Sequence, residues 1–353
     1  MSRRAKHYFA LARRQECRTG VSTPSDPSAL LHCAPVFYFG QVGTKMTLEE
    51  ITAFLEKNYP GQKIKYLGHG SDSAAFRVGA HVFRFTSKGI SIYTREADIC
   101  NFLRKYITVQ IPDIKIVQRD GFQYAMHEML TGEKWSWHRF QFSPRRQRNL
   151  ARSVAGFLAE LHSVDVDAMG RAVPEVRNTM PYIDFDLVQE YLRPYMSARS
   201  LARFRKFYEN VINAPVAKSD MVPVHMGVKG ANSVVYPDGR LKGVFDFGNC
   251  GIYERGRDLV LFSLSRNPRL YRQVLREYQA KTGVHIDRRR IRELALVEFL
   301  WAKRWYVDGT FVPLKAHFLR RNVGLVLMYF WHMPEFMKPF VRLMINIRSR
   351  RAQ

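Results

Sequence analysis

A short β-rich segment inside an otherwise helical half of the chain constrains the fold most. It spans residues 222–247 and holds a Pro-Asp-Gly sequence at 237–239, which predicts a hairpin. The segment ends in Asp-Phe-Gly, so the carboxylate of Asp246 directly follows a strand on a tight turn. Asn232 lies fourteen residues upstream, across the hairpin. One carboxylate and one amide oxygen are the sparse ligand set that Mg²⁺ accepts when waters and nucleotide phosphates supply the rest.

The residues before this segment predict a small α+β lobe. Thr47 and Glu50 have capping-box spacing ahead of an apolar helical face, and Pro-Gly at 60–61 ends that helix. Strands are then expected in an antiparallel arrangement, with one helix at 94–106 inserted among them. The expected strands are 64–67, 74–78, 81–85, 114–117 and 122–129.

The second half of the chain predicts mainly helices. Leu150, Val154, Phe157 and Leu161 mark one long amphipathic helix, and a second is expected over 186–208. The longest C-terminal apolar run, 323–333, is shorter than the roughly 18 residues typical of a membrane-spanning helix. No secretory signal is expected at the start of the chain.

Residues 1–45 differ in composition from the rest of the chain. They contain paired arginines and a region rich in Ser, Thr and Pro, without sustained periodicity. Three interpretations stay open: a disordered extension, sequence upstream of a natural start at Met46, or a mitochondrial-type presequence.

The charge of the chain is unusual. Lys and Arg total 56 against 31 Asp and Glu, a formal net charge of +25. Such a field attracts phosphorylated substrates, nucleic acid or anionic lipid. The other interpretation is a basic surface that serves only solubility.

The four scattered cysteines show no metal-binding spacing and no disulfide framework, which favours a reducing compartment.

The order of these motifs resembles the aminoglycoside phosphotransferase and choline kinase family, which has a protein-kinase-like fold. His225, Asn232 and Asp246 match its H-G-D-x-x-x-x-N and D-F-G motifs, 257–259 matches its R-D-L ending, and 158–162 matches its L-x-x-L-H helix. The resemblance covers about residues 60–300. It implies an α+β, two-lobed fold with ATP and Mg²⁺ as cofactors: a nucleotide-binding, antiparallel-sheet N-lobe at 46–132 and a helical C-lobe at 133–353.

The resemblance also implies roles for individual residues. Asn232 and Asp246 would hold the metal, while Glu96 would be the ion-pair partner of Arg84, which stands where kinases usually carry Lys. For Glu96 a second interpretation stays open, a solvated glutamate in the first helical turn. The glycine-containing loop at 68–73 would cover the phosphates, or is an ordinary hairpin turn. The remaining cofactor-binding candidates, from that loop and from the hinge at 127–130, are Gly68, Gly70, Ser71, Glu128 and Leu130.

One catalytic position departs from the family pattern. Two residues after His225, the other catalytic candidate, the family has the Asp that accepts the substrate hydroxyl proton, and this chain has Gly227. A positioned general base contributes about 10²–10⁴-fold to rate. Lys229 adds a cation near the expected γ-phosphate but cannot act as a base while charged.

Three functions are therefore expected as alternatives. The first is an ATP- and Mg²⁺-dependent phosphotransferase acting on a small hydroxylated substrate, and the second is a pseudokinase that serves as a nucleotide-binding regulator or scaffold. The third is a different transfer on the same fold, such as that of AMP. The basic charge disfavours a polycationic aminoglycoside and favours a neutral or anionic acceptor. We expect a cytoplasmic protein, possible tail contact with an anionic membrane through 336–351, and no nucleic-acid partner.

Overall fold

The computed structural model describes residues 47–69, 73–86, 89–135, 143–177, 198–265 and 267–307, with isolated positions at 185–186, 189 and 193. The chain divides into two compact units, one ending at Gln62 and one beginning at Lys63. The described part of the first unit is helix α2 (Leu48–Asn58), whose capping box between Thr47 and Glu50 is present as predicted. Residues 1–45 lie outside the described part, so their interpretations stay predictions.

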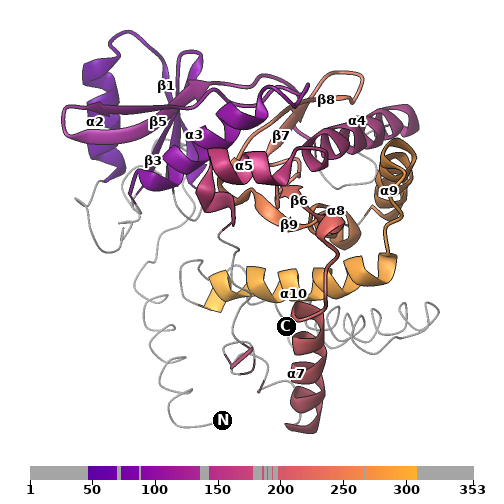
Figure 1. Cartoon of the computed structure of the whole chain (residues 1–353). Coiled ribbons are helices and arrows are strands. Elements are labelled where there is room, and N and C mark those ends of the chain that lie inside the picture. The colour runs from indigo at the N-terminus through magenta and orange to yellow at the C-terminus, as the bar shows by residue number, and fades with distance from the viewer. Residues whose placement is uncertain are drawn as a thin grey trace, which may run out of the picture. The chain divides into compact units, whose positions relative to one another are not determined.

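The second unit begins with one antiparallel sheet (Figure 1). Helix α3 (Ser91–Leu103) follows the third strand, so the predicted helix begins three residues earlier and ends three residues earlier than expected. Every neighbouring pair of strands is antiparallel, in the order β1-β2-β3-β5-β4. The strands are β1 (Ile64–His69), β2 (Ser73–Val78), β3 (His81–Thr86), β4 (Lys115–Arg119) and β5 (Phe122–Glu128), which confirms the predicted strands.

Aromatic side chains build the interior of this sheet. The rings of Phe85 and Tyr124 lie 5.3 Å apart between centroids, and Phe76 meets Phe85 edge-on at 6.1 Å. All three are buried, because alternate residues of neighbouring strands share one face. The sheet is thereby a rigid support for residues at its strand ends.

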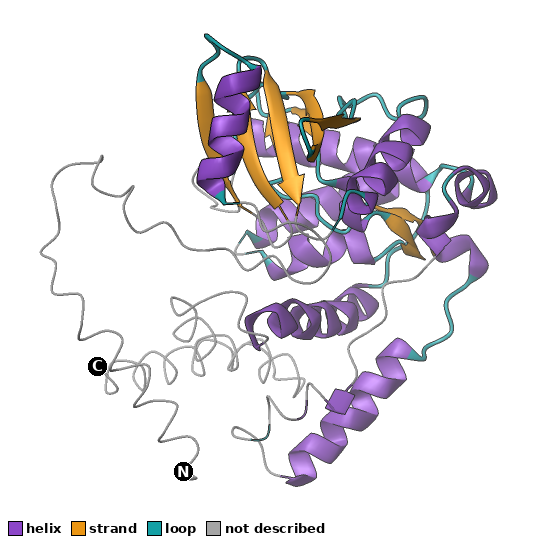
Figure 2. Ribbon diagram, turned by 90° about the vertical axis from the view of Figure 1, so that its left-hand side faces the viewer, coloured by secondary structure: helices purple, strands orange, loops and turns teal. Residues whose placement is uncertain are grey.

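Helices dominate the described residues after β5 (Figure 2). The predicted helix over 186–208 is only partly found: the described helix begins at Ala198 and extends to Ile212, and most residues between 187 and 197 lie outside the described part. No described helix is long and apolar enough to cross a membrane. The helices are α4 (Pro144–His162), α5 (Val166–Ala172), α7 (Ala198–Ile212), α8 (Arg257–Leu264), α9 (Pro268–Thr282) and α10 (Arg288–Val307).

Two strand pairs form the predicted β-rich segment. Strand β6 (Met221–Val224) pairs with β9 (Gly251–Glu254), and β7 (Ser233–Val235) pairs with β8 (Leu241–Val244). The hairpin β7–β8 also bonds to the segment after α3, because Gln110 exchanges backbone hydrogen bonds with residues 242 and 244.

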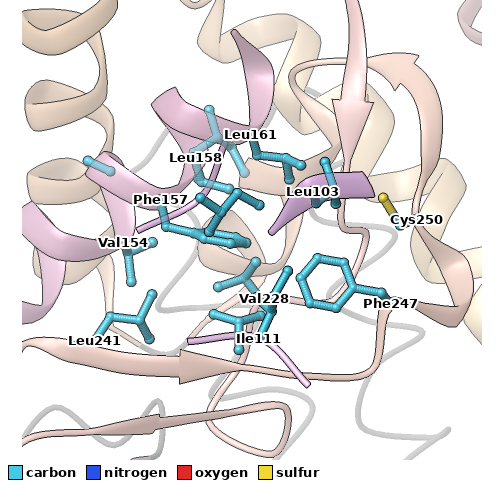
Figure 3. Packing of buried hydrophobic residues seen from close by; sticks show 14 of the residues in the cluster. Leu103, Ile111, Val154, Phe157, Leu158, Leu161, Val228, Leu241, Phe247 and Cys250 are labelled. Atoms are coloured by element: carbon cyan, nitrogen blue, oxygen red, sulfur yellow. The ribbon is translucent and has the colours of Figure 1, made fainter. Parts of the chain in front are cut away.

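One apolar core joins the sheet lobe to the helical lobe. Figure 3 shows Leu103 of α3, Phe157 of α4, Val228 of the loop after β6 and Phe247 of the turn after β8 in the same cluster. All four are buried. Apolar packing therefore anchors the loops that carry the predicted catalytic and metal-binding residues. The fold is of the predicted α+β class, with a small antiparallel lobe and a mainly helical lobe.

Candidate active site

The loop after β6 is held by one buried carboxylate. Asp258, near the start of α8, accepts hydrogen bonds from the backbone N–H groups of His225 (2.9 Å) and Met226 (2.7 Å). Its Oδ2 also lies 3.2 Å from Nε2 of His162 at the end of α4. Burial acts to raise the pKa of Asp258, but His162 and the contacts with His225 outweigh it, so the pKa is lowered. The carboxylate therefore stays charged and fixes the start of the loop.

Met226 occupies a backbone conformation that favours glycine. Its φ is 64°, in the left-handed region, which costs a residue with a Cβ about 1–2 kcal/mol. The bond from its N–H to Asp258 and the packing of its side chain against Val222, Val224 and Tyr253 hold it there. In the family motif this position is the glycine of H-G-D, and here the glycine stands one residue later.

His225 lies beneath the loop and has no exposed surface. Its Nε2 lies 3.2 Å from the carbonyl oxygen of Phe245, and its ring packs edge-on against Phe247 at 4.5 Å between centroids. Burial is the main cause that lowers its pKa, so the imidazole is neutral with Nε2 as the donor. Its Nδ1 is buried and has no hydrogen-bond partner among the described residues. The imidazole thus connects the loop to the segment that carries Asp246.

Gly227 leaves the expected position of the general base without a side chain. A Cβ there would lie 3.1 Å from Nδ2 of Asn232 and 3.4 Å from Nδ1 of His225. These distances are tight but require shifts of only a few tenths of an ångström. The backbone at Gly227 is also outside the left-handed region. A side chain at this position would therefore point beside Asn232.

The hairpin positions the two metal-ligand candidates. The carbonyl oxygen of Asn232 accepts a hydrogen bond from the N–H of Phe245 (2.9 Å), one residue before Asp246. Nδ2 of Asn232 donates to the carbonyl of Gly227 (3.0 Å), which leaves its Oδ1 available as a ligand. Asp246 has a left-handed φ of 71°, is exposed, and makes no hydrogen bond through its carboxylate within the described residues.

These donors fit a magnesium ion that is shared with phosphates. The described residues contain no cluster of three or more His, Cys, Asp or Glu side chains that would hold a metal alone. One free amide oxygen and one free carboxylate are the smaller set that Mg²⁺ takes together with waters and nucleotide phosphates.

Arg84 and Glu96 link the sheet to the Asp-Phe-Gly turn. Nη1 of Arg84, on β3, lies 2.8 Å from Oε2 of Glu96, on α3. The other oxygen of Glu96 accepts a hydrogen bond from the N–H of Phe247 (3.1 Å). Glu96 is only 1% exposed, and its burial raises its pKa, with Arg84 opposing and Asp246 adding to the effect. Of the two interpretations for Glu96, the structure shows the ion pair and not a solvated residue of the first turn.

Arg95 makes a second connection between α3 and this turn. Its guanidinium donates to the carbonyl of Gly248 and, at 2.7 Å, to the carbonyl of Cys250. Arg95 was not among the candidates predicted from the sequence, although it adjoins Glu96. An arginine on an otherwise amphipathic helix gives no signal by itself, because its targets are backbone carbonyls 153 and 155 residues away.

The phosphate-loop candidates are described in part. Gly68 ends a bulge in the pairing of β1 with β2 and has a φ of 124°, which favours glycine. A Cβ at Gly68 would meet nothing within 4 Å among the described residues, so the backbone there is open to approach. Gly70 and Ser71 lie outside the described part of the chain.

The hinge candidates follow β5. The N–H of Met129 donates to the carbonyl of Ala80 (2.8 Å), and Nδ1 of His127 contacts the carbonyl of Glu128 (2.8 Å). The backbone N–H and C=O of Leu130 have no hydrogen-bond partner within the described residues. Leu130 is thus the hinge position with backbone groups available to a ligand, and the Glu128 side chain is exposed.

The fold is that of the two-lobed, protein-kinase-like phosphotransferases. The model of the phosphotransferase enzyme family matches residues 63–294, and the chain belongs to this family. The search of curated proteins found no match.

Solved structures share the fold. The GDP and kanamycin complex of APH(2")-IIia is 18% identical, with a TM-score of 0.62 over 79% of this chain and 97% of the other. The streptomycin–ATP complex of APH(2")-IIa is 22% identical, with a TM-score of 0.55 over 75% and 91%. The macrolide 2'-phosphotransferase MphH from Brachybacterium faecium is 16% identical, with a TM-score of 0.54 over 82% and 100%. At these identities the likeness shows the fold.

Proposed function

We propose that the chain binds ATP with Mg²⁺ at the site formed by β3, α3, the loop after β6 and the turn after β8. The observation that carries this proposal is a pair of contacts made by Glu96. Its carboxylate forms an ion pair with Arg84 and accepts a hydrogen bond from the N–H of Phe247. Arg84 would contact the nucleotide phosphates, and Asn232 with Asp246 would hold the metal, which neutralises phosphate charge when bound. Complexes of similar structures with ATP and GDP support a nucleotide ligand.

Phosphate transfer to a small hydroxylated acceptor is the activity that this site supports best. Phosphoryl transfer depends mostly on positioning and electrostatics, so these contacts can support a slow reaction without a side-chain base. The missing carboxylate at Gly227 removes about 10²–10⁴-fold of rate. His225 acts as a positioning residue in this proposal, because it is buried beneath the loop.

The acceptor that the charge favours is neutral or anionic. The net charge is +25, and Lys229 lies in the same loop as Gly227. A polycationic aminoglycoside would be repelled by this field.

Because the reaction uses ATP, we place it in the cytoplasm. The proposed membrane contact through 336–351 lies outside the described residues.

A pseudokinase is the second candidate, and Gly227 favours it. The nucleotide and metal contacts are assembled, while the residue that would activate the acceptor has no side chain. In that case nucleotide binding would regulate or recruit a partner without transfer.

One experiment separates the two candidates. Mg²⁺-dependent ATP binding and ATP hydrolysis are measured side by side for the native chain, Gly227→Asp and the double variant Met226→Gly/Gly227→Asp. The double variant places glycine at the left-handed position and the carboxylate after it, which avoids the strain at Met226. We expect hydrolysis to rise by about 10²-fold or more. Ala231→Asp, which adds a carboxylate at an exposed position of the same loop, is the matched control.

Each outcome assigns a function. Hydrolysis that rises in Gly227→Asp or in the double variant, but not in the control, supports the phosphotransferase. ATP binding that Asp246→Ala abolishes, with no hydrolysis in any variant, supports the pseudokinase. ATP binding that is absent, or indifferent to Asp246→Ala, contradicts the nucleotide site itself.

A further inference from the structure

The outer face of α9 carries arginines without nearby acidic partners. Arg269, Arg272 and Arg276 recur at helical spacing and are exposed. The one carboxylate of α9, Glu277, instead lies 3.5 Å from Arg152 of α4. The outer face of this helix is therefore a line of positive charge.

These arginines border a cavity of about 560 Å³. Arg288, the first residue of α10, completes the lining with a fourth guanidinium. None of the four makes an ion pair within the described residues. Asp287, next to Arg288 in the sequence, accepts a hydrogen bond from the N–H of Arg289. Four uncompensated cations around one cavity repel each other, and a bound anion would relieve that repulsion.

Other arginines of the same lobe show the contrast. Arg255 pairs with Asp220 at 2.8 Å, and Arg290 pairs with Glu254 at 2.8 Å. Buried or half-buried arginines in this lobe are thus neutralised by protein carboxylates. The cavity arginines are not.

A buried amide borders the same cavity. Gln273 lies on α9 between the arginines, is 9% exposed, and its Oε1 is buried without a hydrogen-bond partner in the described part of the chain. An unpaired buried amide oxygen costs about 1–3 kcal/mol. Rotation of the Gln273 amide towards the cavity would let a ligand hydroxyl satisfy it.

We propose that this arginine cavity binds a small hydroxylated compound that carries at least two phosphate groups. Guanidinium groups form bidentate hydrogen bonds with phosphate oxygens. A cavity of this volume can hold a small molecule. None of its residues belongs to the proposed nucleotide site, so this site would be additional to it. The same phosphate chemistry occurs in free sugar phosphates and in lipid headgroups.

Titration calorimetry of the full chain tests the proposal with fructose 1,6-bisphosphate, without nucleotide or Mg²⁺. We expect Arg272→Gln/Arg276→Gln to weaken binding by about tenfold or more, because charge-assisted hydrogen bonds are lost. The control Lys115→Gln/Arg119→Gln removes two charges from exposed positions on β4 and should leave binding within about twofold. Gln273→Leu should weaken the bisphosphate by about threefold and leave inorganic pyrophosphate, which has no carbon-bound hydroxyl, unchanged.

A second arm identifies the source of the phosphates. Vesicles of phosphatidylcholine with phosphatidylinositol 4-phosphate, whose headgroup carries two phosphates and free hydroxyls, are cosedimented with the same variants. Loss confined to the cavity variant supports the site, as a soluble-phosphate site if it concerns the bisphosphate and as a headgroup site if it concerns only the vesicles. Equal loss in both double variants, or no binding of either probe by the native chain, would overturn the proposal.

Discussion

The two sides of the Asp-Phe-Gly turn differ in how completely their polar groups are paired. On the side of α3, Glu96 bonds with both Arg84 and the N–H of Phe247, and Arg95 bonds with two carbonyls of the turn. On the side of the loop after β6, Nδ1 of His225 has no partner among the described residues, and Gly227 has no side chain.

This difference separates the binding of nucleotide and metal from the activation of the acceptor, two tasks that the family usually combines. The groups that would hold a nucleotide and its metal are positioned by ion pairs and backbone hydrogen bonds. The position that would activate an acceptor is occupied by backbone alone, next to a strained Met226. Under the proposed function, the molecule would therefore retain the contacts for nucleotide binding and lack the side-chain base for fast transfer.

The first prediction concerns Asp258, the carboxylate that supports the loop after β6. Asp258→Ala takes away the acceptor for two backbone N–H groups and for His162. Because the charge is buried with its partners, we expect a loss of about 3–5 kcal/mol in the free energy of unfolding. Urea titration followed by circular dichroism measures it.

The matched control is an aspartate in an exposed ion pair. Asp113→Ala breaks its contact with Arg104 (3.1 Å), at a position where both side chains are exposed, and should change the free energy of unfolding by less than about 1 kcal/mol. Similar losses for the two variants would show that Asp258 does not hold the loop.

The second prediction concerns the paired side of the turn. Glu96→Gln keeps the shape of the side chain but removes the charge that faces Arg84, so we expect Mg²⁺–ATP affinity to fall by about 10–100-fold. Calorimetry or competition with a fluorescent nucleotide measures the affinity. Asp98→Asn, at an exposed position of the same helix, should leave it unchanged. An unaltered affinity in Glu96→Gln would contradict the role of the ion pair in nucleotide binding.

The sequence carried most of the fold because local signals agreed with the global arrangement. The capping box at Thr47, the period-two strands and the helix that ends in His162 are readable within a few residues. The placement of Asn232 and Asp246 at the two ends of one hairpin was also readable, because a hairpin brings its ends together, while their role as metal ligands stays a prediction.

Long-range and backbone effects were not readable in the same way. The left-handed backbone at Met226 follows from Asp258, 32 residues away, and no local pattern places a methionine in that conformation. The arginine cavity likewise depends on the meeting of α9 with the start of α10. The excess of Lys and Arg in the sequence indicated positive charge but not where on the fold the arginines gather.

The third prediction is a modest pH dependence of stability that arises from His225, on the side of the loop after β6. The pKa of His225 is lowered in the folded chain by burial, from an ordinary value of 6.5. The unfolded chain therefore binds the extra proton at a higher pH than the folded chain, so stability falls as pH falls below about 6.5. Between pH 7.5 and 5.5 one such histidine removes at most about 1.4 kcal/mol from the free energy of unfolding, the limit for a folded imidazole that takes up no proton in this range.

Urea titrations across this pH range, comparing the native chain with His225→Asn, measure that contribution. His127, whose pKa is also lowered by burial, adds a dependence of the same sign that persists in the variant. His285→Asn, at an exposed position, should keep the native slope. If His225→Asn also keeps the native slope of stability against pH, the imidazole is not held neutral beneath the loop. The contrast between the two sides of the turn would then lose its main evidence, the unpaired Nδ1 of His225.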